Sequence, residues 1–137
     1  MNARTFLISA AATLVVMFAF AATWHLIVFK ALYERLAIYT RAEPIVPLGL
    51  LSMALQALIF AYLFPIFAAG RPPIAAGLAF GVLMGVLMGS IGALAEAGKQ
   101  NVTSLATFLT LESAFYVIQY TVLGLVLGVL DGWLTRG

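Results

Sequence analysis

The sequence predicts an all-α integral membrane protein, an antiparallel bundle of four transmembrane helices. Hydrophobic residues make up 64% of the 137 residues and charged residues only 9%, which is too apolar for a soluble domain of ordinary composition. Four apolar runs are each long enough to cross a hydrocarbon core of about 30 Å. The length fits one domain, residues 1–137. The formal charge of +2 forms no basic cluster of the kind that binds nucleic acid.

The first span is predicted at residues 5–29. A secretory signal peptide is the alternative, because Arg4 precedes the run and Ala19-Phe20-Ala21 resembles a cleavage site. The apolar run continues past that point to Phe29. We therefore predict a helix that is retained.

Residues 30–43 form an amphipathic segment after the first span. It is predicted to lie against the lipid headgroups, with Tyr33 and Tyr39 as interfacial anchors. Pro44 and Pro47 are predicted to end it, because the residue before a proline is pushed away from helical angles. Proline is tolerated in the first turn of a helix, so the second span should begin between them.

Three further spans are predicted at residues 47–69, 74–95 and 105–130. Pro65 is expected to kink the second span, because it removes one backbone donor. The connection at residues 70–73 is short, and short connections make neighbouring helices antiparallel. Spans two and three should therefore pack as a hairpin.

Glycines spaced four apart mark the third and fourth spans. In a soluble helix each would cost about 1 kcal/mol relative to alanine. In lipid, helices associate where small residues let two backbones approach. The sequence therefore predicts close packing of the third and fourth helices through Gly77, Gly81, Gly85, Gly89, Gly124 and Gly128.

Polar side chains within the predicted spans are candidates for a site. An ionisable group there costs about 2.5–3.5 kcal/mol on insertion scales, so each one needs a reason. Because the chain direction alternates, the end of span one and the starts of spans two and four lie in one half of the membrane. We predict a polar pocket for a small ligand or a proton, opening towards the loops after spans one and three. Its residues are His25, Gln56, Glu112, Tyr116 and Gln119.

A structural role is the alternative for each of these residues. Glu112 can be a protonated carboxyl that hydrogen-bonds to a neighbouring helix. His25 is close enough to the interface to be an ordinary interfacial residue beside Trp24. Gln56 and Gln119 are most simply interhelical hydrogen-bonding residues.

Glu112 is the best candidate for a functional residue. No Lys or Arg stands within another predicted span, so we expect this carboxyl to be protonated at neutral pH. The chain has no cysteine and a single histidine, which predicts no metal site and no cofactor. No nucleophile has a credible base partner, and no enzymatic activity is predicted.

The chain length and four-span plan are similar to those of the small multidrug exporters. In that family the essential glutamate stands in the first span, whereas here Glu112 stands in the fourth. The resemblance implies one candidate function, a homodimeric proton-coupled carrier of small molecules.

The function that we predict first is a non-enzymatic binding or accessory subunit, holding a small ligand or a partner helix. It should contact the lipid bilayer and assemble as a homo-oligomer or within a larger membrane complex. We expect a bacterial inner membrane, with both termini in the cytoplasm because Arg4 directly precedes the first span.

Overall fold

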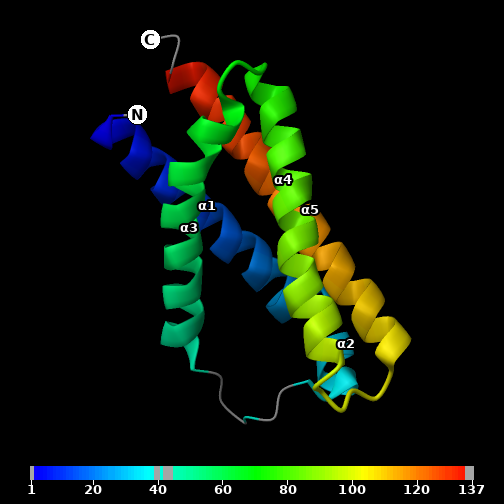
Figure 1. The fold of residues 1–137 in the computed structure, drawn as a ribbon. Coiled ribbons are helices and arrows are strands. Elements are labelled where there is room, and N and C mark those ends of the chain that lie inside the picture. Colours follow the sequence, from blue (N-terminus) through cyan, green and yellow to red (C-terminus); the bar gives the residue numbers. More distant parts are fainter. Residues whose placement is uncertain (1, 39–40, 42–44, 135–137) are drawn as a thin grey trace.

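The computed structural model describes residues 2–38, 41 and 45–134, and it is all-helical there. Four helices are long and apolar enough to cross a membrane: Ala3–Val28, Val46–Ala68, Pro73–Ala95 and Leu105–Leu134. The predicted set of four membrane-length helices is confirmed. By helix length and composition, this is a multi-pass membrane protein. The four helices run alternately up and down, so the start of the first and the end of the fourth lie at the same end (Figure 1).

The first span consists of the helix α1 (Ala3–Ala22) and a π-helical segment η1 (Thr23–Val28). The Asn2 side chain caps α1, because its Oδ1 accepts a hydrogen bond from the Thr5 backbone N–H at 2.7 Å. In η1 the wider helical turn adds a residue. This segment was not predicted from the sequence.

A short helix, α2 (Lys30–Leu36), follows the first span directly. It ends at Ala37, whose φ of 55° lies in the left-handed region. Tyr39 and Pro44, which the sequence analysis assigned to this connection, lie outside the described residues. The prediction that Tyr33 is an interfacial anchor is wrong, because only 2% of its surface is exposed.

The second span is the helix α3 (Val46–Ala68), with Pro47 in its first turn. Its helical assignment continues through Pro65. The chain then turns at Gly70, whose φ of 72° favours glycine. This tight turn places α3 and the next helix antiparallel (Figure 1).

The third span consists of α4 (Pro73–Gly89) and a second π-helical segment, η2 (Ser90–Ala95). The fourth span is the single helix α5 (Leu105–Leu134). Between them, Lys99 Nζ donates to Glu96 Oε1 at 2.9 Å. This interaction and a hydrogen bond from Gln100 hold the pKa of the Glu96 carboxyl below its usual value.

The backbones of α4 and α5 approach each other very closely. A Cβ added to Gly85 would lie 3.0 Å from the backbone oxygen of Tyr116. A Cβ on Gly81 would lie 2.8 Å from Thr121 Cα, and one on Gly124 would lie 2.7 Å from Gly81 Cα. A side chain larger than hydrogen therefore does not fit at these positions without moving a backbone.

Two apolar clusters fill the bundle. The larger one joins all four spans. The smaller one packs α2 against the beginning of α5 and includes Tyr33. The larger cluster contains Met17, Phe60, Phe64, Phe80, Tyr120, Leu123 and Leu127, and the smaller contains Tyr33, Leu36, Phe108 and Leu111.

Replacing Gly81 by alanine is expected to lower the melting temperature in detergent. Overpacking a well-packed core costs about 1–3 kcal/mol, and we expect the upper end because the neighbouring atoms at Gly81 belong to a backbone. Gly49→Ala is the matched control, since a Cβ there meets no atom within 4 Å. Equal melting temperatures for the two variants would contradict the close approach of α4 and α5.

Candidate functional site

Glu112 lies on α5 and only 7% of its surface is exposed. Its Oε1 accepts a hydrogen bond from the hydroxyl of Tyr33 on α2. The Tyr33 oxygen in turn accepts a hydrogen bond from Trp24 Nε1 at 3.2 Å. The carboxyl is therefore held by a short chain of hydrogen bonds from the first span and α2.

His25 approaches Glu112 from η1. Its Nδ1 lies 3.0 Å from the carbonyl oxygen of Ala21. Because a carbonyl only accepts, this contact places a proton on Nδ1. The other ring nitrogen, Nε2, faces Glu112 and lies 4.0 Å from its Oε1. We call Trp24, His25, Tyr33 and Glu112 the Glu112 cluster.

Aromatic rings surround the Glu112 cluster. The His25 ring packs edge-on against Phe115, with centroids 4.5 Å apart, and lies 4.6 Å from the Tyr33 ring. The Trp24 ring is 4.5 Å from Phe29 and 5.8 Å from Phe115. Apolar rings screen charges poorly, so interactions among the polar atoms are stronger here than in water.

The π-helical segment brings two neighbouring residues to the same partner. The Phe29 backbone N–H donates to the Trp24 carbonyl at 2.9 Å, five residues back, which is the π-helical spacing. Trp24 and His25 both contact the Phe115 ring as a result. π-Turns of this kind are frequent at functional sites.

Gln56, predicted as a pocket residue, contacts a different part of α5. Its Oε1 accepts a hydrogen bond from the hydroxyl of Tyr120, and its Nε2 donates to Ser52 Oγ at 3.1 Å. Tyr120 stands eight residues beyond Glu112, about 12 Å along the helix. The structure therefore brings His25 to Glu112 and pairs Gln56 with Tyr120.

Tyr116 and Gln119 lie on α5 between these two contacts. Tyr116 packs on the third span, because a Cβ added to Gly89 or Gly92 would meet its side chain. Gln119 is 2% exposed, and its Oε1 has no hydrogen-bond partner. A glutamine in the sequence does not indicate that its side-chain oxygen is unpaired.

Three buried residues and one packing glycine were not predicted from the sequence. Tyr33 was taken for an interfacial anchor, and Gly92 was not included among the packing glycines. Ser9 and Thr13 are buried polar residues of the first span, although that span was treated as apolar. Thr5, Ser9 and Thr13 are spaced four residues apart, and this spacing could have indicated a polar face on the first helix.

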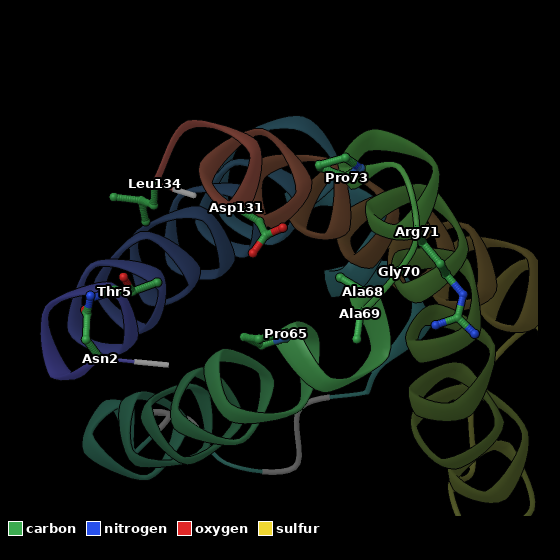
Figure 2. A pocket seen from close by; sticks show the side chains of 10 residues that line it. All are labelled: Asn2, Thr5, Pro65, Ala68, Ala69, Gly70, Arg71, Pro73, Asp131 and Leu134. Atoms are coloured by element: carbon green, nitrogen blue, oxygen red, sulfur yellow. The ribbon is translucent and has the colours of Figure 1, made fainter. Parts of the chain in front are cut away.

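A cavity of about 500 Å³ lies at the other end of the bundle, where α1 begins and α5 ends (Figure 2). Thr5, Pro65 and Asp131 form part of its wall. The Asp131 carboxylate points into the space between the helices, and the Arg71 guanidinium points away from it (Figure 2). This opening faces the end opposite to the one predicted from the sequence.

Within the part of the chain that the structure describes, no group of three or more His, Cys, Asp or Glu side chains could hold a metal ion. Comparisons with protein-family models, with curated proteins and with solved structures find no match to this chain.

Replacing Tyr33 by phenylalanine is expected to destabilise the protein by about 1–3 kcal/mol, the cost of leaving a buried polar group unsatisfied. The change removes the hydroxyl that Glu112 and Trp24 both contact. Thermal unfolding in detergent measures the effect. Tyr62→Phe is the control, because Tyr62 is 59% exposed. A melting temperature as high as that of the control would show that the hydrogen-bond chain contributes nothing to stability.

Proposed function

We propose that this chain is a non-enzymatic binding or accessory subunit of a membrane, whose Glu112 cluster holds one exchangeable proton. The observation that carries the proposal is the position of His25 Nε2, 4.0 Å from Glu112 Oε1. A carboxyl and an imidazole at this separation make one coupled proton site. The enclosure by aromatic rings favours a proton over a larger ligand.

The proton can reside on His25 or on Glu112, and the terms below favour Glu112. On His25 it creates an ion pair, whose attraction at 4.0 Å is about 4 kcal/mol at an effective dielectric constant of about 20. Against this stands a desolvation cost of several kcal/mol per buried ion. On Glu112 the proton leaves both groups neutral. Either way the pair keeps one proton and no net charge.

Loss of this proton leaves a negative charge that the spans do not neutralise. Among the described residues of the four spans, Arg4, near the start of α1, is the only Lys or Arg. It is about 30 Å from His25 along the first span. The proton should therefore be released only when something at the site replaces it, such as a cation or a rearranged partner.

A homodimeric proton-coupled carrier that uses Glu112 is the second candidate. The cavity of about 500 Å³ beside Asp131 favours it, because that volume could admit a small molecule. A carrier should release protons when its substrate is added to the detergent-solubilised protein. A binding subunit should not.

Membrane placement and assembly complete the proposal. We place the chain in a bacterial inner membrane, with both termini in the cytoplasm. In the most apolar stretch of each span, only 22–39% of the residues are buried inside the protein. The remaining surface is available to lipid and to another copy or subunit. The glycines of α4 and α5 hold these two helices together in lipid, where close approach replaces the hydrophobic effect.

Glu112→Gln is expected to fold and to lose the exchangeable proton, because the amide keeps the shape of the neutral acid without its titration. Infrared difference spectra should show a protonated-carboxyl band in the wild type that is missing in the variant. Asp131→Asn, which removes the other carboxyl within the spans, should leave this band in place. A band that remains in Glu112→Gln would show that the protonated carboxyl is not Glu112.

Single cysteines test the proposed topology without background, since the chain has none of its own. A cysteine at Asn2 and one at Asn101 stand at exposed positions before the first span and between the third and fourth. An impermeant thiol reagent added to intact cells should label only the cysteine at Asn101. Labelling of the cysteine at Asn2 alone would reverse the orientation.

A further inference from the structure

A row of hydroxyl side chains runs down one face of α1. Thr5, Ser9 and Thr13 stand four residues apart, so they lie one above another on the helix. Thr5 belongs to the wall of the cavity at the end of the bundle (Figure 2). Ser9 is buried and Thr13 is 0% exposed. The row therefore leads from an open cavity into the closed interior.

Two buried polar atoms along this direction have no hydrogen-bond partner. They are Thr13 Oγ1 and Gln119 Oε1. A threonine hydroxyl inside a helix commonly bonds back to the carbonyl four residues before it, and Thr13 does not. Buried polar groups that lack a protein partner are normally satisfied by ordered water.

The two unpartnered atoms are close enough in depth for water to connect them. His25 and Glu112 lie at one level, because their side chains approach to 4.0 Å. The helical rise places Thr13 about 18 Å and Gln119 about 10 Å from that level, towards the cavity. The two atoms therefore differ in depth by about 8 Å, and water in this layer of the bundle would satisfy both of them.

We propose that a chain of buried waters occupies the interior of this bundle and gives Glu112 access to protons from the end where α1 begins. It runs from the Thr5–Asp131 cavity past Ser9 and Thr13 to Gln119, and it continues from there for about 10 Å along α5 to the Glu112–His25 pair. A proton that enters the cavity passes along the hydrogen bonds and adds to the Glu112–His25 pair, and its return leaves the waters unchanged. The delivery to Glu112 rests on the proposed function, and the presence of the waters does not.

The charged and titratable groups beside this route are few among the described residues. Asp131 stands at the cavity, with Arg71 at its edge pointing away (Figure 2). The Arg71 guanidinium instead lies over the Phe67 ring, 4.8 Å from its centroid. At the inner end, His25 and Tyr33 face Glu112 from η1 and α2, and Tyr116 stands one turn further along α5.

Radiolytic hydroxyl labelling tests for the waters directly. Met17 stands one turn after Thr13 on α1 and is only 1% exposed. Its side chain is a suitable probe because methionine is readily oxidised. Short X-ray pulses in water enriched in heavy oxygen should label Met17 in the wild type despite its burial. A Met17 that stays unlabelled in the folded wild type would overturn the proposal without any variant.

Thr13→Val removes the hydroxyl and keeps the shape of the side chain. We expect labelling of Met17 to fall several-fold, and Thr13→Ser to retain it. Thr110→Val is the control, because Thr110 is exposed on α5, and it should leave the labelling unchanged. Equal labelling of Met17 in Thr13→Val and in the wild type would contradict a water held by Thr13.

Thermal unfolding of the same variants provides a second measurement. If the Thr13 hydroxyl were dry, its removal would relieve an unpaired polar group and raise the melting temperature. If it binds water, Thr13→Val should leave the melting temperature unchanged or lower it. A higher melting temperature would therefore count against the water chain.

Failure of this inference and failure of the proposed function are distinguishable. Thr13-dependent labelling of Met17, together with no infrared band from Glu112, would support the water chain and contradict the proton site at Glu112. A Glu112 band together with an unlabelled Met17 would support the proton site at Glu112 and contradict the water chain. Hydrogen–deuterium exchange of the Glu112 carboxyl, slowed in Thr13→Val but not in Thr110→Val, would link the two.

Discussion

The backbone contact between α4 and α5 determines how the rest of the bundle is arranged. Gly81 and Gly124 let the two helices approach until a single Cβ would lie against the opposite backbone. α5 is thereby fixed with its glycine face towards the third span. Other faces of the same helix carry Glu112 and Gln119, both of which are buried. The close contact thus positions the polar residues of α5 for the first span and α2 to cover.

Polar groups in an apolar interior must find their partners within the protein, because lipid offers none. This requirement explains why α2 folds back onto α5. The Tyr33 hydroxyl reaches Glu112 across 79 residues of sequence, and Trp24 completes the hydrogen-bond chain. A segment whose composition is typical of a membrane surface is held against the bundle by the Tyr33–Glu112 hydrogen bond and by the apolar contacts of Leu36 with the start of α5.

The sequence was sufficient for the four long helices, because apolarity summed over about 20 residues is a strong signal. It also predicted that His25 and Glu112 lie in the same half of the membrane, and the structure brings their side chains to within 4.0 Å of each other. It could not place Tyr33, whose burial depends on a partner far away in the chain. The π-helical segment and the pairing of Gln56 with Tyr120 were equally hidden, because both arise from tertiary packing rather than from local periodicity.

The two ends of the bundle differ in a way that bears on the choice between the candidate functions. Tyr33 closes the end near Glu112 and is itself buried, while the opposite end opens into the cavity beside Asp131. A carrier must expose its site to each side in turn, and here that requires the Tyr33–Glu112 and Trp24–Tyr33 hydrogen bonds to break together. A binding subunit needs only one open side. The closed cluster therefore favours the proposed binding subunit over the proposed carrier.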